Sequence, residues 1–194
     1  MKLFVTGIDT NIGKTITSAI FCKALKAEYY KPIQCGDLDN SDSLKISDWG
    51  IKTFPESLRL AQPKSPNFAS QHNINLENIE LPQTSNPLVV EGAGGVLVPL
   101  NENDFIIDLA KRWNIPVVLV CKSYLGSLNH TLLSVEAIRS RGIEIKGLIF
   151  NGVSNEESES FLERRTGLKI LLKIRQEENF NQKIIEQYAK EIKL

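Results

Sequence analysis

The sequence predicts an α/β fold in which helices cover both faces of a mostly parallel β-sheet. Short apolar runs alternate with segments of helical periodicity along the chain, which is the pattern of β-α units. A glycine-rich segment that ends in Gly13-Lys14-Thr15 joins the first apolar run to the first helical segment. Polar or glycine-rich residues also follow the later runs, and open α/β sheets bind ligands beyond the carboxyl ends of their strands. We therefore expect a ligand site at one edge of the sheet.

The order of the predicted elements follows from the apolar pattern. The apolar runs predict strands at residues 3–6, 28–33, 87–91, 116–121 and 145–150. Helical periodicity predicts helices at residues 14–26, 41–49, 104–113, 156–165 and 183–191. A further helix carries a stripe of apolar residues and stops at Gly142; the stripe consists of Leu128, Leu132, Val135 and Ile138. Between residues 41 and 82 the chain has prolines at positions 55, 63, 66 and 82, so beyond the short helix we expect mostly loop.

The composition limits the classes of protein to consider. Lysine plus arginine and aspartate plus glutamate both number 23, so the formal net charge is zero, and we expect no binding of nucleic acid or of an anionic membrane. No apolar stretch reaches the roughly 20 residues of a membrane span, and the N-terminus lacks a signal-peptide pattern. Three widely spaced cysteines fit reduced thiols rather than disulfides. We expect a cytoplasmic protein of one domain, residues 1–194.

The segment after the first predicted strand has the residue types that a phosphate-binding loop needs. Such a loop turns backbone N–H groups inward, and it needs a lysine for phosphate oxygens and a hydroxyl for Mg²⁺. Gly13, Lys14 and Thr15 supply these in order at a helix start. The usual loop has four residues between its glycines, whereas five separate Gly7 from Gly13, and Ile8 stands where the first glycine is expected. We interpret the segment as a variant phosphate loop; the alternative is a strand-to-helix turn with an incidental Gly-Lys-Thr.

Lys31 and Asp42 each have an ordinary structural interpretation beside a functional one. Lys31 ends the second predicted strand next to Pro32, where it is either a solvated strand end or a cation at the same sheet edge as the loop. Asp42 begins a short predicted helix, where an acid commonly caps or stabilises the first turn. Its alternative role is that of a Mg²⁺ ligand, because Mg²⁺ prefers carboxylate and phosphate oxygens.

Two further strand ends carry polar residues. Glu91 ends an apolar run and precedes the glycine-rich residues 92–95, and glycines let a backbone approach a ligand closely. An acid at the end of such a strand is typical of nucleotide-binding enzymes. Asn151-Gly152 follows the last predicted strand and is either a tight turn or, through its carboxamide, a reader of the adenine edge. His72 and His130 lack metal-ligand spacing and are interpreted as structural.

Taken in order, these segments resemble the dethiobiotin synthetase family, the ATP-dependent ring-closing ligases of biotin synthesis. The matching segments are residues 7–15 (GIDTNIGKT), 30–36 (YKPIQCG), 41–44 (SDSL), 91–95 (EGAGG) followed by 98–100 (VPL), and 125–131 (LGSLNHT). The resemblance implies a P-loop NTPase-like domain that forms homodimers, with active sites near the subunit interface. It implies 7,8-diaminononanoate, CO₂ and Mg-ATP as substrates, and dethiobiotin, ADP and phosphate as products.

The resemblance also implies the roles of individual residues. The catalytic residues would be Lys14 and Lys31, of which Lys31 would stabilise a carbamate and the charge that develops towards the γ-phosphate. The Mg²⁺ ligands would be Thr15, Asp42 and Glu91. The residues that would bind the nucleotide form a larger set: Asn11, Ile12, Gly13, Lys14, Thr15, Ile16, Asp42, Glu91, Gly92, Ala93, Gly94 and Asn151. The residues that would contact the amine substrate are Cys35, Gly126 and Asn129.

Four positions depart from the family pattern. Asn11 stands where some members have an acid, and Asn67 stands where a histidine is expected. Cys35 stands where a hydroxyl is common, and a thiol is a weaker hydrogen-bond donor. Arg175 replaces a proline in a segment that contacts the base, so the departure bears on base selectivity.

Three alternatives remain beside this interpretation. A ligase similar to cobyrinic acid diamide synthetase shares the fold but usually carries a glutaminase domain, for which 194 residues leave no room. A regulatory ATPase of the partitioning type generally has an extra lysine early in the phosphate loop, where this chain has Ile8, Asp9 and Thr10. A catalytically inactive nucleotide-binding module is disfavoured by the presence of Lys31, Asp42 and Glu91.

Overall fold

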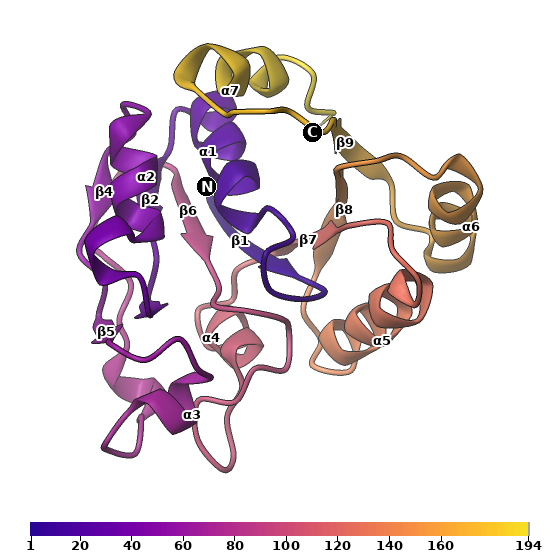
Figure 1. Ribbon diagram of the computed structural model, residues 1–194. Coiled ribbons are helices and arrows are strands. Elements are labelled where there is room, and N and C mark those ends of the chain that lie inside the picture. The colour runs from indigo at the N-terminus through magenta and orange to yellow at the C-terminus, as the bar shows by residue number, and fades with distance from the viewer. Residues whose placement is uncertain (194) are drawn as a thin grey trace.

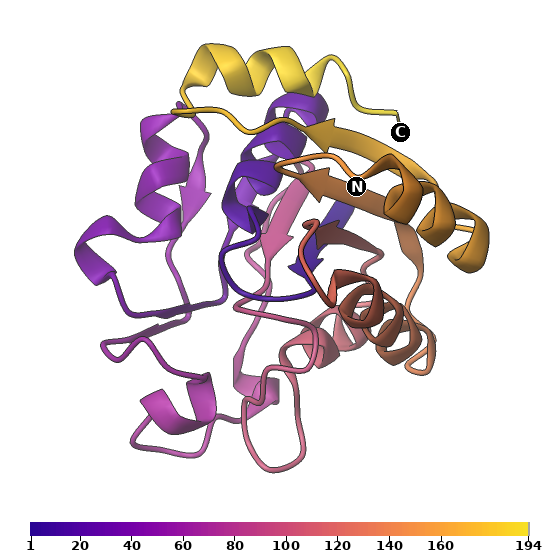
Figure 2. The same ribbon diagram turned by 45° about the vertical axis from the view of Figure 1, so that its right-hand side comes forward.

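The predicted α/β architecture is confirmed in a computed structural model that describes residues 1–193. Its main sheet has the strand order β4-β2-β6-β1-β7-β8-β9, and every neighbouring pair is parallel. Its strands are β1 (Lys2–Gly7), β2 (Glu28–Tyr30), β4 (Thr53–Phe54), β6 (Leu88–Glu91), β7 (Val117–Cys121), β8 (Ile145–Asn151) and β9 (Ile170–Ile174). A second sheet pairs β3 (Ile33–Cys35) with β5 (Leu58–Leu60). Figures 1 and 2 show the helices on both sides of the main sheet.

The helices divide between the two faces because strand residues alternate in direction. Leu3 and Val5 of β1 belong to one buried apolar cluster, which includes residues of α1 (Lys14–Leu25), α2 (Asp42–Asp48) and α7 (Gln182–Ala189). Phe4 belongs to the cluster on the other face, with residues of α4 (Ile106–Arg112), α5 (Ser127–Arg139) and α6 (Glu156–Thr166). Three short helices complete the elements: η1 (Leu38–Asn40), α3 (Pro66–Ala69) and η2 (Leu76–Asn78). None of the helices within residues 1–193 is both long enough and apolar enough to span a membrane.

The predicted second strand, residues 28–33, is wrong in its second half. β2 ends at Tyr30, and the chain then leaves the main sheet at Lys31-Pro32. Proline has no N–H to donate to a ladder, so Pro32 ends the pairing of β2. Ile33–Cys35 pairs instead with Leu58–Leu60 as β3 and β5. Lys31 therefore lies at the junction of the two sheets.

Two other stretches were predicted incompletely. Beyond α2, the stretch expected to be mostly loop contains the strands β4 and β5, which have two and three residues and are too short to show periodicity. β9 was not predicted, because Lys173 interrupts its short apolar stretch, so the segment shows neither strict alternation nor an unbroken apolar run. The other predicted strands and helices are confirmed to within two or three residues at their ends.

The strand order places the site. β1 lies at the centre of the main sheet, with β6 and then β2 on one side and β7 on the other. Because these strands are parallel, their carboxyl ends share one edge of the sheet. The loop after β1, Lys31 after β2 and Glu91 at the end of β6 are therefore brought together by three adjacent strands.

Glu28→Gln is expected to lower the melting temperature at pH 7 by about 2–4 °C, the shift that about 1 kcal/mol produces in a chain of this size. Glu28 is buried at the start of β2, and its Oε1 accepts hydrogen bonds from Lys52 Nζ at 2.5 Å and Asn86 Nδ2 at 3.0 Å. Hydrogen bonds from Lys52, Thr84 and Asn86 lower its pKa to about 2.

The sign of the pH dependence follows from that lowered pKa. The ionised Glu28 stabilises the fold fully above the ordinary pKa of 4.5, and this contribution is lost as the pH falls towards 2. Thermal unfolding between pH 7 and pH 3 should therefore show the difference from wild type narrowing below pH 4.5. Glu144→Gln is a matched control, because its pair with Lys146 is exposed. Equal melting temperatures of Glu28→Gln and wild type at pH 7 would contradict the prediction.

Candidate active site

The loop between β1 and α1 has the form of a phosphate-binding loop. Its first part is fixed to the sheet, since Ile8 N–H donates to Val120 O at 3.1 Å. Its last part opens α1, where Gly13 has a φ of +96° and accepts from Thr17 N–H at 3.0 Å. The Lys14 ammonium donates to Asp9 O at 2.8 Å, so its side chain folds back over the loop. The loop thus carries a cation and the backbone N–H groups of a helix N-terminus at one place.

The unusual glycine spacing has a steric reason. A Cβ at position 7 would lie 2.2 Å from Cδ1 of Ile12, a side chain that is buried in the apolar cluster under α1. A side chain at position 7 would therefore have to displace the buried Ile12, which favours glycine here, one residue before the expected place. Gly13 is restricted in the same way, because a Cβ there would lie 2.2 Å from Asn151 Nδ2.

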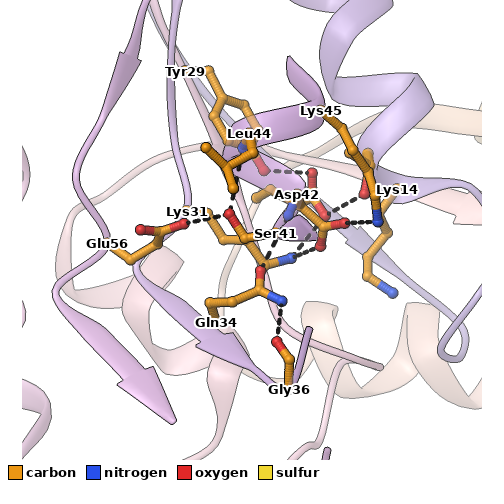
Figure 3. A network of polar contacts seen from close by, with 12 residues as sticks. Lys14, Tyr29, Lys31, Gln34, Gly36, Ser41, Asp42, Leu44, Lys45 and Glu56 are labelled. Carbon is orange, nitrogen blue, oxygen red and sulfur yellow. Dashed lines mark hydrogen bonds and ion pairs between the residues drawn. The ribbon is translucent and has the colours of Figure 1, made fainter. Parts of the chain in front are cut away.

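Lys31, Asp42 and Glu91 form a charged cluster beside the loop. Lys31 points towards Asp42 (Figure 3), and its Nζ lies 2.5 Å from Asp42 Oδ2. The same Nζ lies 3.0 Å from Glu91 Oε1. The same Glu91 oxygen accepts a hydrogen bond from Thr15 Oγ1 at 3.1 Å. Glu91 and Lys31 are almost fully buried, whereas Asp42 is partly open to solvent. The cluster places two carboxylates against one buried ammonium, with the Thr15 hydroxyl hydrogen-bonded to one of them.

Burial and neighbouring charges set the protonation of the cluster. Burial lowers the pKa of Lys14 to about 8, an effect that Glu91 opposes and Lys31 adds to. Burial also disfavours the charge of Lys31, but Glu91 and Asp42 outweigh it and raise the pKa of Lys31 above its ordinary value. Burial opposes ionisation of Asp42 as well, yet Lys31 lowers the pKa of that carboxyl. Burial raises the pKa of Cys35, which is therefore a thiol at neutral pH.

A cavity of about 950 Å³ joins the loop to this cluster, a size within the usual range for small-molecule sites. The predicted site residues that line it are Asn11, Gly13, Lys14, Thr15, Ile16, Lys31, Cys35, Asp42, Glu91, Ala93 and Gly94. Its outer part is lined by residues from the segment after β5 as well, among them Pro63 and Phe68. The two lysines and two acids that were predicted from separate segments thus face one space. A second cavity, of about 480 Å³ along β5, contains none of the predicted site residues.

Five of the predicted site residues do not line the large cavity. Ile12 is buried, and Gly92 packs against Phe4. Asn151 lies behind the loop, where its Nδ2 donates to Ile12 O at 2.9 Å. Gly126 and Asn129 are exposed near the start of α5.

Two residues that support the site were not predicted. Tyr29 OH donates to Glu91 Oε2 at 2.9 Å. Gln34 links two segments, since its Nε2 donates to Gly36 O at 2.9 Å and its Oε1 accepts from Asp42 N–H at 3.4 Å. Residues two apart in a strand face the same side, so the sequence indicated that Tyr29 lies on the same side as Lys31. The partner strand and its register, which decide the contact with Glu91, are not readable from one sequence.

Comparisons with known proteins identify the family. A family model described as an AAA domain matches residues 1–183. The chain is 42% identical to an ATP-dependent dethiobiotin synthetase of Christiangramia forsetii, over 98% of this chain and 95% of the relative. A synthetase of the same name from Cytophaga hutchinsonii is 44% identical, over 97% of this chain and 95% of the relative. The chain belongs to the dethiobiotin synthetase family. A further synthetase, from Chlamydia pneumoniae, is 40% identical over 99% of the chain and 89% of the relative.

Solved structures of much lower identity confirm the P-loop fold for this member of the dethiobiotin synthetase family. A ParA family ATPase from Chlorobium tepidum matches with a TM-score of 0.59 at 16% identity, over 97% of both chains. A plasmid partition protein from Borrelia burgdorferi matches with a TM-score of 0.57 at 16% identity, over 99% of both chains. At that identity the likeness concerns the fold alone. The family is given by the synthetases, which are 40–44% identical.

Proposed function

We propose that this chain is an ATP-dependent ligase of biotin biosynthesis that forms dethiobiotin from 7,8-diaminononanoate and CO₂. The observation that supports this most directly is the convergence of Lys14, Lys31, Asp42 and Glu91 on one cavity. The cavity has room for a triphosphate and a second, smaller substrate. Membership of the dethiobiotin synthetase family supplies the substrate class.

The proposed reaction has three steps on the substrates. One amine of the diamine attacks CO₂ and, on losing a proton, becomes a carbamate. The γ-phosphoryl group of ATP passes to a carbamate oxygen, which gives ADP and a carbamic–phosphoric anhydride. The second amine attacks the carbamate carbon, loses a proton and expels phosphate, so that a cyclic urea closes.

The residues of the cavity match the demands of phosphoryl transfer, which depends mainly on positioning and charge neutralisation. Lys14 and the backbone N–H of Gly13 would hold phosphate oxygens. Lys31, which carries its charge at neutral pH, would stabilise the carbamate and the charge between it and the γ-phosphate. The ion pairs with Asp42 and Glu91 would hold the Lys31 ammonium in place before the substrates bind.

Mg²⁺ would be held by Thr15, Asp42 and Glu91. The three donor groups lie close together. Thr15 Oγ1 is 3.1 Å from Glu91 Oε1, and the carboxylates of Asp42 and Glu91 both contact the Lys31 ammonium. Two carboxylates and a hydroxyl, with phosphates as the remaining ligands, suit Mg²⁺. When bound, the ion supplies neutralisation of the charge on the β- and γ-phosphates.

The base and the amine substrate would be bound away from the phosphates. Asn151 has one N–H committed to Ile12 O, which leaves its carbonyl oxygen and a second N–H for adenine. Cys35 would face the amine substrate from β3. Gly126 and Asn129 would bind the carboxylate of the amine substrate at the start of α5.

We also infer a homodimer and a cytoplasmic location. The segment with Gly126 and Asn129 is exposed, and the neighbouring Leu125 side chain is 102% exposed, which suits an active site near a subunit interface. The three cysteines are free, as in a reducing compartment. Analytical ultracentrifugation at micromolar concentrations tests the dimer directly.

The decisive experiment supplies the diamine, ¹³C-labelled bicarbonate and Mg-ATP to the purified chain. We expect mass spectrometry to find one ¹³C atom per dethiobiotin, at the urea carbon, with one ADP released per product. ATP hydrolysis without labelled product, at saturating diamine and bicarbonate, would contradict the proposal and favour a regulatory ATPase. A requirement for glutamine as nitrogen donor would favour a ligase of the cobyrinic acid diamide synthetase type.

A further inference from the structure

Tyr29 contacts an acid of the active site through its hydroxyl group, while its ring lies in the apolar core. Its side chain is 0% exposed and lies in the apolar cluster under α1. Its hydroxyl reaches out of that cluster and donates to Glu91 Oε2 at 2.9 Å. A buried tyrosine hydroxyl normally finds a partner, and here the partner is an acid of the cavity.

The contact depends on the register of two neighbouring strands. β2 and β6 are parallel, and Tyr29 lies opposite Val89. Glu91 is two residues further along β6, so its side chain lies on the same face as that of Val89. The long tyrosine side chain spans this offset, which a shorter residue at position 29 would not.

The two oxygens of Glu91 have different surroundings. Oε1 accepts from Thr15 Oγ1 at 3.1 Å and from Lys31 Nζ at 3.0 Å. Oε2 accepts from Tyr29. Rotation of the carboxylate away from this arrangement would leave a buried oxygen and a buried hydroxyl without partners, which is unfavourable for both groups.

We propose that Tyr29 is a positioning residue that anchors Oε2 of Glu91 and thereby directs Oε1 towards Mg²⁺ beside Thr15. The inference rests on the proposed function through one assignment, that of Glu91 as a Mg²⁺ ligand. Partners that orient metal ligands typically contribute 10–100-fold to metal affinity or activity. A purely structural tyrosine, by contrast, would affect the melting temperature and leave the Mg²⁺ dependence unchanged.

The chain offers a matched control in the next residue. Tyr30 is also buried, but it belongs to the apolar cluster on the opposite face, and its hydroxyl contacts Ser57 and donates to Glu80 O at 3.0 Å. Tyr29→Phe and Tyr30→Phe therefore remove the same hydroxyl group from adjacent buried positions. Only the first removal affects Glu91.

The test measures binding of a fluorescent ATP analogue at increasing Mg²⁺, and in parallel the Mg²⁺ dependence of ATP turnover. We expect Tyr29→Phe to raise the half-saturating Mg²⁺ concentration at least roughly tenfold in both measurements. Tyr30→Phe should leave it within about twofold of wild type. Melting temperatures of both variants establish that each is folded under the assay conditions.

Glu91→Gln separates the possible outcomes. Equal Mg²⁺ dependence of wild type and Tyr29→Phe would overturn the inference, and so would an equal shift in Tyr29→Phe and Tyr30→Phe. An unchanged Mg²⁺ dependence in Glu91→Gln would overturn it too, because Tyr29 acts only through Glu91. If the wild type makes no dethiobiotin but Tyr29→Phe still weakens Mg²⁺-dependent nucleotide binding, the proposed substrates are wrong and the role of Tyr29 stands.

Discussion

Lys31→Ala is expected to lower kcat for ring closure by roughly 10²–10³-fold, the loss that follows removal of one preorganised charge stabiliser. Lys31 is 4% exposed, and its ammonium lies between Asp42 and Glu91 at the end of β2. Without it, the phosphoryl group in transfer loses a fixed positive partner in a site where charges are poorly screened by water. Nucleotide binding should persist, since Lys14 and the loop backbone remain.

Steady-state kinetics with saturating Mg-ATP and diamine measures this loss, and a fluorescent ATP analogue measures the retained binding. Lys52→Met is the matched control, because it also removes an ammonium 2.5 Å from a buried carboxylate, that of Glu28. Lys52 does not line the cavity, so kcat should be unchanged there. Wild-type turnover in Lys31→Ala would exclude Lys31 from the mechanism.

Gly13→Ala is expected to weaken nucleotide binding by at least roughly tenfold, and more if the loop cannot shift. A non-glycine residue at a φ of +96° is strained by about 1–3 kcal/mol. The added methyl group would also lie 2.2 Å from Asn151 Nδ2, and that amide is held by Ile12 O. Either the loop or Asn151 must move, and both are proposed to contact the nucleotide.

Two variants separate the strain from the collision. Gly142→Ala places alanine at a φ of +71°, where no atom lies within 4 Å of the new Cβ. This variant should therefore lower the stability and leave nucleotide binding intact. Adding Asn151→Ala to Gly13→Ala removes the collision, so loop geometry should partly recover while base contacts are lost. Isothermal titration with an ATP analogue and with inorganic triphosphate distinguishes the two effects. Wild-type affinity for triphosphate in Gly13→Ala would contradict the prediction.

The parts of the fold that the sequence predicted are those with long, regular patterns. The buried strand β7 is an unbroken apolar run of five residues, and the helices α1 and α5 show helical periodicity over 12 and 13 residues. β4 and β5 have two and three residues, and their existence depends on the strands that they pair with. Pro32 indicated a possible break after Lys31. Proline also occurs on edge strands and at bulges of a continuing sheet, so Pro32 alone did not predict the break.

The candidate site was predictable where a residue type and its place on a strand end combined. Lys14, Thr15 and Glu91 follow or precede glycines at such ends, and parallel strands bring their ends to one edge. The contact of Tyr29 with Glu91 was not predicted, because it depends on the pairing of β2 with β6. The contact of Asn151 with the loop joins residues 139 positions apart, which local sequence patterns do not reveal.

The departure of the chain from the main sheet at Pro32 divides the cavity between two frameworks. The phosphate loop and Glu91 belong to the seven-stranded sheet, whereas Gln34 and Cys35 belong to the two-stranded one. The part of the wall that holds Cys35 is thus built separately from the part that would meet the triphosphate, whereas Gly126 and Asn129 follow β7 of the larger sheet. Substitutions in the smaller sheet offer evolution, or a protein engineer, a way to change the acceptor molecule while the energy-coupling half is inherited intact.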